Sequence, residues 1–466
     1  MNRTDVFLTI ACLTLAAGVA IQVCGVPADD AWITLRYARN LLAGHGWCYE
    51  PGVAVNASTS AASTLVHAAA GALAGDLRVA QFVVFVLGLG GTAALLGLEF
   101  GARGSLGRRL PGLVAAAFVL TTPMFWTVYG MESPLLLLGC VGSWVAWRHE
   151  RFGLAAAAAA FLVLVRPEGV LMPVALVVDR ALRRRDLHAL PWRRIVIVFS
   201  LPLIAWAVFS WLEFGALAPS TLAAKQAQAQ SLWQWSLFFR GAKRSLTMFD
   251  AREIGLHHRV FVGLLLTSVV ALVVTRHRAL ALLGWIALVN VGYVVLVVPY
   301  YHWYAVPLHF GLTVAMASVF DLAWRAGRSV RAFAIVCGVA WVALQMPAWG
   351  DRGQGHAGYW DVGAWLDAHA AADATIGSVE IGCVGYAVWP RPIVDACGLV
   401  TTDLIPDVAA GECARWIERH RPDYVVLHVP PWDGFESAAE ASPTFAEYRE
   451  VYRARNGTVR VVSRVP

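Results

Sequence analysis

Two adjacent carboxylates, Asp29 and Asp30, directly follow an apolar run that extends from Phe7 to about Val26. Acidic side chains at the end of a membrane helix are costly unless they are solvated, paired or bound to a cation. There a carboxylate could act as a general base for a hydroxyl group that attacks a carbon atom. The alternative is structural, because either acid could cap a helix or pair with Arg36 or Arg39. On a helix the two side chains project about 100° apart, so they need not share one role.

A second set of ionisable and aromatic residues falls at the ends of later apolar runs, namely Glu132, Arg166, Glu168, Lys225, Tyr300, Tyr301 and His302. A guanidinium group forks onto phosphate oxygens, so Arg166 is a candidate phosphate ligand. It could equally form an ion pair with Glu168 at the helix break that Pro167 predicts. Lys225 is a second phosphate candidate, or an interfacial lysine whose stem lies along apolar surface.

The remaining candidates also have two interpretations each. His302 can change its charge near neutral pH and could donate to a phosphate or a leaving oxygen. Tyr301 could bind substrate or belong to an aromatic belt at the membrane surface. Glu132 could bind an acceptor sugar or cap the helix that follows it. No Cys/His metal spacing occurs, so no cofactor is certain, and Asp29 or Asp30 would be the ligand if a divalent cation took part.

The composition places these residues in a membrane protein. Hydrophobic residues make up 58% of the 466 residues and charged residues 15%, whereas soluble domains average about 45–50% and 25%. The net charge of +6 could suggest nucleic acid. The arginines, however, stand in short clusters between apolar runs, which excludes that class and is typical of loops between membrane helices.

A transmembrane helix needs about 20 apolar residues. Segments that reach or approach this length predict roughly eleven transmembrane helices. They lie at about 7–27, 79–100, 110–128, 133–148, 152–166, 168–180, 195–213, 260–275, 279–298, 304–324 and 332–349. The pair between 152 and 180 is short, so either member could be re-entrant. Arginine-rich loops alternate with loops that lack Lys and Arg, which predicts a cytoplasmic N-terminus and an outer C-terminus. The membrane that we expect is a bacterial plasma membrane.

Two outer segments, about 28–78 and 214–258, interrupt the predicted bundle, and residues 218–235 indicate an interfacial helix. From about residue 350 the composition becomes that of a soluble domain. Helices are expected at 361–371 and 408–419, and strands at 375–380, 391–395 and 424–428. This alternation predicts a transmembrane module over 1–349 and an extracytoplasmic α/β domain over 350–466. A disulfide between Cys383 and Cys397 is one option there, and Asp395 is interpreted as a structural cap.

Several motifs together resemble the GT-C superfamily of polyprenyl-phosphate-sugar glycosyltransferases. The segments that carry the resemblance are Asp29–Leu41 with Gly44-His45-Gly46, Gly130-Met131-Glu132-Ser133-Pro134, Arg166-Pro167-Glu168-Gly169, Pro219-Ser220-Thr221 with Ala224-Lys225, and Gly382–Tyr386 with Asp395–Leu399. The chain is most similar to the branch of terminal β-(1→2) arabinofuranosyltransferases of mycobacterial cell walls. It departs from that branch at Tyr49-Glu50-Pro51-Gly52, where the family's turn carries Asn, and at Ser220, where Asn is usual.

The resemblance implies an integral-membrane enzyme that moves a sugar, with arabinofuranose one candidate, from a polyprenyl phosphate to an extracytoplasmic glycan. Asp29 or Asp30 would act as base in a direct, inverting attack, and Arg166, Lys225 or His302 would bind the donor phosphate. Glu132, Glu168 and Tyr301 would bind substrate. Protein or lipid A would be the acceptor in other branches. A transporter and a non-catalytic glycan-binding scaffold are the alternatives outside the enzymes, although no paired halves are evident.

Overall fold

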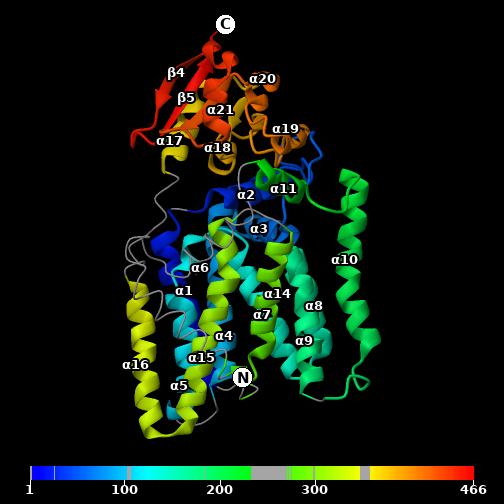
Figure 1. Cartoon of the computed structure of the whole chain (residues 1–466), viewed down its shortest axis with the longest axis vertical. Coiled ribbons are helices and arrows are strands. Elements are labelled where there is room, and N and C mark those ends of the chain that lie inside the picture. The colour runs from blue at the N-terminus through cyan, green and yellow to red at the C-terminus, as the bar shows by residue number, and fades with distance from the viewer. Residues whose placement is uncertain are drawn as a thin grey trace.

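A bundle of long helices carries a small mixed sheet at one end (Figure 1). The computed structural model describes residues 3–25, 27–101, 106–183, 185–231, 270, 272–273, 275, 277–296, 300–346 and 357–465. The N-terminal helix starts at the far end of the bundle, and the chain finishes in the sheet (Figure 1). The apolar helices and the soluble composition of the tail therefore separate along the long axis of the molecule.

Ten of the predicted membrane segments coincide with helices in the described residues. These are α1 (Arg3–Val23), α4 (Leu77–Phe100), α5 (Leu106–Thr121), α7 (Ser133–Arg148), α8 (Phe152–Val165), α9 (Leu171–Leu182), α10 (Trp192–Phe214), α14 (Leu280–Val295), α15 (Val306–Ala326) and α16 (Arg328–Gln345). The segment predicted at 260–275 lies almost wholly outside the described residues. Within the described residues, four helices are long and apolar enough to cross a membrane, namely α1, α4, α10 and the helix over residues 302–326, and others are apolar but shorter.

Proline accompanies two breaks in the bundle, one inside a predicted segment and one between two predicted segments. The segment at 110–128 is not one helix, because α5 ends at Thr121 and the one-turn helix α6 (Met124–Thr127) follows Pro123. Between α8 and α9 the chain is extended at Arg166 and then forms the 3₁₀ turn η1 (Pro167–Val170). Proline disfavours helical geometry in the residue before it. The break therefore leaves the Arg166 side chain at a helix end instead of along a helix face.

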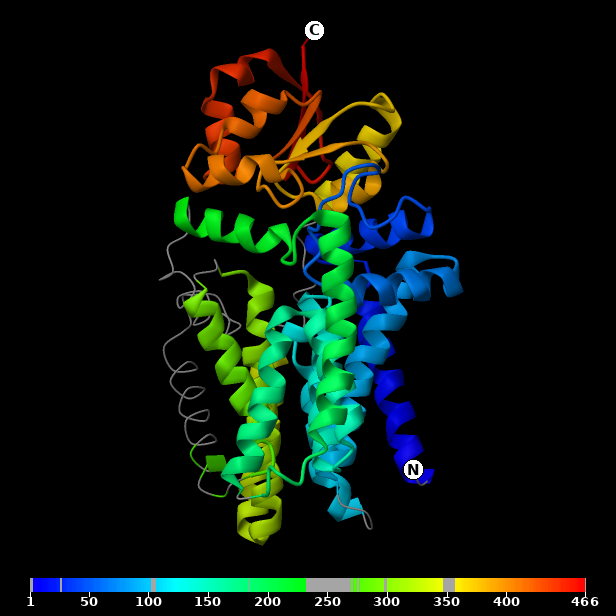
Figure 2. The same cartoon turned by 90° about the vertical axis from the view of Figure 1, so that its right-hand side faces the viewer.

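Three shorter helices lie across the end of the bundle, between the bundle and the sheet (Figures 1 and 2). They are α2 (Asp29–Leu42), α3 (Ala61–Ala74) and α11 (Ser220–Ser231). Figure 2 shows α11 lying crosswise to the long axis of α10. This placement fits the interfacial helix expected at 218–235, of which the described residues include the first part.

The tail forms a five-stranded sheet in the order β2-β1-β3-β5-β4. The strands are β1 (Ile376–Ser378), β2 (Ile393–Asp395), β3 (Tyr424–His428), β4 (Tyr448–Arg453) and β5 (Val459–Arg464). β1 pairs in parallel with β2 and β3, whereas β5 is antiparallel to β3 and β4. The three expected strands are confirmed, and β4 and β5 were not predicted.

Helices surround this sheet, namely α17 (Ala357–His369), α18 (Gly382–Ala387), α19 (Ile405–Ala409), α20 (Arg415–His420) and α21 (Phe435–Ala441), together with the 3₁₀ turns η5 (Thr402–Leu404) and η6 (Pro443–Glu447). The single helix expected at 408–419 is wrong. Gly411 has a φ of +80° there, a conformation that ends the first helix. All eight cysteines are free thiols, so the structure contains no Cys383–Cys397 disulfide.

The sheet and α2 share one apolar core. Trp32, Leu35 and Tyr37 of α2 belong to the same buried cluster as Val362 and Ile376 from the tail. The Arg36 guanidinium, which is fully buried, donates to the carbonyl oxygens of Tyr49 at 2.8 Å, Gly385 at 2.5 Å and Arg391 at 2.8 Å. A buried charge requires such partners. The segment that follows α1 and the tail are thus held together as one unit.

Candidate active site

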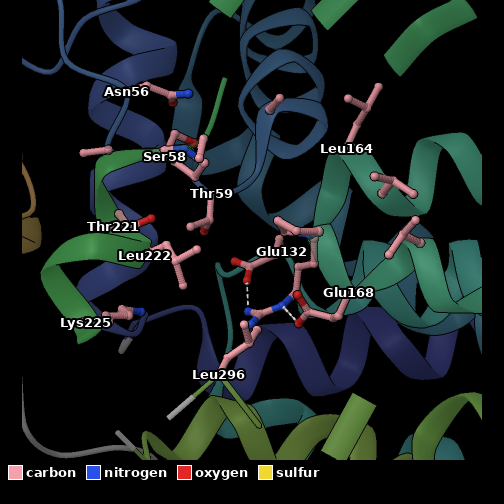
Figure 3. Close-up of a pocket in the computed structure, with 18 of the residues that line it drawn as sticks. Asn56, Ser58, Thr59, Glu132, Leu164, Glu168, Thr221, Leu222, Lys225 and Leu296 are labelled. Atoms are coloured by element: carbon pink, nitrogen blue, oxygen red, sulfur yellow. Dashed lines mark hydrogen bonds and ion pairs between the residues drawn. The ribbon is translucent and has the colours of Figure 1, made fainter. Parts of the chain in front are cut away.

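A cavity of about 640 Å³ opens where α2, α11 and the α8–η1 break meet α14. Its polar side carries Asp30, Thr34, Asn56, Ser58, Thr59, Glu132, Arg166, Glu168, Thr221, Lys225, Tyr293 and Tyr304. Its apolar side carries side chains of the membrane helices, including Leu164, Leu171, Leu203, Trp206, Val289 and Leu296. Figure 3 shows Lys225 and Thr221 on one wall and Glu132 and Glu168 on the facing wall. The cavity can therefore hold a molecule with one charged and one apolar part.

The two adjacent acids have different environments. Asp29 is buried, and its carboxylate accepts from the backbone N–H groups of Gly382 and Cys383, each at 2.7 Å. These amides form the first turn of α18, so Asp29 joins α2 to the tail. Asp30, the next residue, lines the cavity. The expectation that the two acids need not share one role agrees with this geometry, in which Asp30 alone faces the space available to a substrate.

Burial raises the pKa of Asp30 to about 6, and the nearby Lys225 ammonium opposes the rise in part. Within the described residues, Asp30 forms no ion pair within 4 Å. A carboxylate with a raised pKa is a stronger base and is still mostly ionised at neutral pH. Neither acid pairs with Arg36 or Arg39, which donate to backbone carbonyl groups instead.

Arg166 is held by two carboxylates. Its guanidinium lies 2.5 Å from Glu168 and 2.5 Å from Glu132, as the dashed lines in Figure 3 show. The Tyr293 hydroxyl donates to Glu168. The ion pair between Arg166 and Glu168 is therefore confirmed, and Glu132 does not cap α7 with its side chain. Because two anions surround one cation, this cluster offers little positive charge to a phosphate.

Lys225 is the cation that faces the cavity without a carboxylate partner in the described part of the chain. Its ammonium group donates to the Tyr304 hydroxyl at 3.2 Å and lies 5.0 to 5.5 Å from the ring centres of Tyr301, Trp303 and Tyr304. Burial favours the neutral amine, but Tyr304 and Asp30 outweigh it and raise the pKa of Lys225. Lys225 therefore stays protonated and can bind an anion.

The loop before α15 is only partly in the site. His302 is exposed and does not line the cavity, and Tyr301 donates to Gln228 at 2.8 Å and stacks on Trp303. Tyr304, three residues beyond Tyr301, lines the cavity instead. The 3₁₀ turn η2 (His302–Ala305) determines which of these side chains faces the cavity. The apolar pattern of the segment does not reveal this turn. The phosphate role of His302 and the substrate role of Tyr301 thus have no support from the cavity geometry.

Sequence reasoning missed Glu380, which lies at the end of β1 beside the two acids of α2. Burial, followed by the charges of Asp29 and Asp30, raises the pKa of Glu380 well above its usual range, and its side chain is hydrogen-bonded to Asp29. No local signal joins residues 29 and 380. Among the described residues, no three His, Cys, Asp or Glu side chains are placed to hold a metal ion.

The overall fold is similar to that of the solved structures of ArnT, in agreement with the architecture that the motifs predicted. The apo crystal structure of ArnT from Cupriavidus metallidurans superposes with a TM-score of 0.59 at 14% identity, over 98% of this chain and 97% of ArnT. The structure of the same protein bound to undecaprenyl phosphate gives a TM-score of 0.55 at 14% identity, over 99% and 98%.

In sequence, the chain is similar to the terminal beta-(1->2)-arabinofuranosyltransferase of Mycobacterium tuberculosis. The two are 31% identical over 274 residues, which make up 53% of this chain and 43% of that enzyme. The chain thus spans less than half the length of this relative. Residues 347–462 match a family described as a domain of unknown function, DUF8728. The resemblance to an arabinofuranosyltransferase is confirmed by sequence, and the likeness to ArnT extends over nearly the whole fold.

Proposed function

We propose that this chain is an integral-membrane glycosyltransferase that moves a sugar from a polyprenyl phosphate to an extracytoplasmic glycan. The observation that carries the proposal is the cavity in which a raised-pKa carboxylate, Asp30, and a half-buried ammonium, Lys225, stand beside an apolar wall. The relative named for arabinofuranosyl transfer supports arabinofuranose as the first sugar to test. The ArnT complex with undecaprenyl phosphate supports a polyprenyl-phosphate donor.

The donor would enter between the membrane helices with its phosphate at Lys225. The helix α10 supports such entry, because Leu203 and Trp206 line the cavity while most of the helix surface is exposed, as expected for contact with lipid. An ammonium group that donates to a phosphate oxygen also stabilises the charge that develops there as the bond to the sugar breaks.

The reaction would proceed in one displacement. The acceptor hydroxyl oxygen forms a bond to the anomeric carbon while the bond from that carbon to the phosphate oxygen breaks, and the hydroxyl proton passes to Asp30. Polyprenyl phosphate leaves as an anion held by Lys225. A single displacement inverts the anomeric centre. Asp29 would act as a positioning residue, because its carboxylate is occupied by the α18 amides.

This scheme places the cavity on the outer side of the plasma membrane, with the N-terminus of α1 in the cytoplasm and residues 350–466 outside. The test is an assay of the purified protein with polyprenyl phosphates that carry arabinofuranose, 4-amino-4-deoxyarabinose or mannose, and with glycan, lipid A and peptide acceptors. We expect transfer of one of these sugars to a glycan. Absence of transfer from every lipid donor would overturn the proposal.

A further inference from the structure

A second hollow lies in the tail, outside the cavity described above. This cleft has a volume of about 370 Å³ and lies between the turn after α2 and the sheet. Its apolar lining consists of Val53, Val55, Pro392, Ile393, Val394 and Val400, and its polar lining includes Glu50, Thr375, Thr401, Thr402, Asp403 and His420. Neither the proposed base nor the phosphate-binding lysine borders it.

The cleft and the cavity share two walls. On the first wall, Val55 lines the cleft and the next residue, Asn56, lines the cavity. On the second wall, Leu399 lines the cavity and Val400 lines the cleft. The two hollows therefore lie on opposite sides of the same two backbone segments, so a molecule that occupied both would have to pass around these segments.

The second wall is held firmly in place. The buried Asp395 carboxylate accepts from the backbone N–H groups of Cys397 at 2.9 Å and Val400 at 3.0 Å, and also from that of Leu399. This confirms the cap that the sequence predicted. On the membrane side, Ser220 of α11 donates to the Leu399 carbonyl at 2.8 Å. Since α11 also carries Lys225, the wall links the cleft to the helix that would bind the donor.

The chemistry of the cleft suits a neutral polyol. Glu50 uses one carboxylate oxygen to accept from the Ile393 amide at 2.5 Å, and Asp403 lies 3.2 Å from His420 Nε2. Carboxylate and hydroxyl groups around an apolar floor can bind the hydroxyl groups and C–H face of a sugar ring. The two carboxylates would repel the phosphate of a lipid donor, so the cleft is unsuited to that substrate.

We propose that this cleft binds an internal sugar residue of the glycan acceptor, whose reacting end lies in the cavity beside Asp30. The inference rests on the proposed function and adds the acceptor subsite to it. Long acceptors would then bind more tightly than short ones, because only a long chain can occupy both hollows at once.

The experiment uses arabinofuranose oligosaccharides of two and eight residues as acceptors. Thr402 is exposed, so Thr402→Trp fills the cleft without disturbing the core. We expect the KM for the octasaccharide to rise about tenfold, which corresponds to the loss of one or two hydrogen bonds. The KM for the disaccharide, the KM for the donor and kcat should stay unchanged. An unchanged KM for the octasaccharide would overturn the inference.

A matched pair of variants controls for effects on folding. Asp403 and Asp407 both pair with Arg419, but only Asp403 lines the cleft. Asp403→Asn should weaken octasaccharide use several-fold, whereas Asp407→Asn should not. If the wild type transfers no sugar, saturation-transfer NMR of the octasaccharide with the whole chain tests binding to the cleft independently of the proposed activity. Binding that Thr402→Trp abolishes supports the cleft, and absent or unaffected binding rejects it.

Discussion

Carboxylates that are buried or half-buried occur at both ends of the helical bundle, but their partners differ. At the end away from the sheet, Asp321 of α15 is bound by Arg278 and Arg325, each at 2.9 Å, with His277 at 3.5 Å. At the other end, Asp30 faces a cavity and forms no ion pair with a described residue. An acid surrounded by cations can stabilise helix ends but cannot readily take up a proton. Asp321 therefore stabilises the fold, whereas Asp30 is available for chemistry.

The largest expected effect follows from replacing the acid that faces the cavity. Asp30→Asn keeps the shape of the side chain but removes the base, so kcat should fall about 10³-fold, within the range usual for general base catalysis. The thermal midpoint and the binding of polyprenyl phosphate should stay near wild-type values. A variant that retains full transfer would show that the available carboxylate is not the base.

Removing the cation of the cavity should have the next largest effect. Lys225→Met keeps the apolar stem and removes the charge, so the KM for the lipid donor should rise about 10- to 100-fold, as expected for one charge-assisted hydrogen bond. Lys225→Arg, which keeps the charge, should recover part of the loss. Steady-state kinetics with varied donor concentration give the result. An unchanged donor KM in the Met variant would move the phosphate site elsewhere.

The pH dependence tests the contrast between Asp30, which faces the cavity, and Asp321, which is paired with cations. Because the pKa of Asp30 is raised to about 6, Asp30 is protonated below that pH and cannot accept the acceptor proton. The kcat/KM should therefore rise about tenfold between pH 5 and pH 7.5 and then level off. The residual activity of Asp30→Asn should lack this ascending limb. A kcat/KM of the wild type that does not change with pH would argue against Asp30 as the base.

Asp29 should give a smaller effect of a different kind. Asp29→Asn replaces two charge-assisted hydrogen bonds to the α18 amides, each worth about 1.5–3 kcal/mol when charged. We expect a lower thermal midpoint and a several-fold loss of kcat, with an unchanged pH profile for the remaining activity. A loss of kcat as large as that of Asp30→Asn at an unchanged midpoint would assign Asp29 a direct role.

Asp321 should show no kinetic effect. Asp321→Asn leaves Arg278 without its buried partner, and such a loss costs about 3 kcal/mol when both groups are buried; Arg325 is largely exposed and adds little. The thermal midpoint should fall, while kcat and both KM values of the folded protein stay unchanged. A fall in kcat at an unchanged thermal midpoint would contradict the purely structural role of Asp321.

The sequence predicted the helices well because burial in lipid demands long apolar runs, and it placed Asp29, Asp30, Arg166 and Lys225 at one end of the bundle. The structure adds the partners. Arg166 and Glu168 are neighbours in the chain, so their ion pair was predictable. The third member, Glu132, comes from another helix and was not.

Asp29 and Asp30 could not be told apart from the sequence because their difference depends on residues far away. The amides of Gly382 and Cys383 bind one acid and leave the other open. The same limit applies to Glu380, and to the tyrosines before α15. There, the turn η2 points Tyr304 into the cavity where the sequence favoured Tyr301 and His302.

The contact between Asp29 and α18 has a consequence for biogenesis. The residues that it joins are more than 350 positions apart, with the described membrane helices between them. During synthesis, α2 must therefore wait for the tail to be made before Asp29 finds its amides. A nascent chain that is still being inserted cannot yet have a complete site, so any activity of the cavity would begin only when translation is nearly finished.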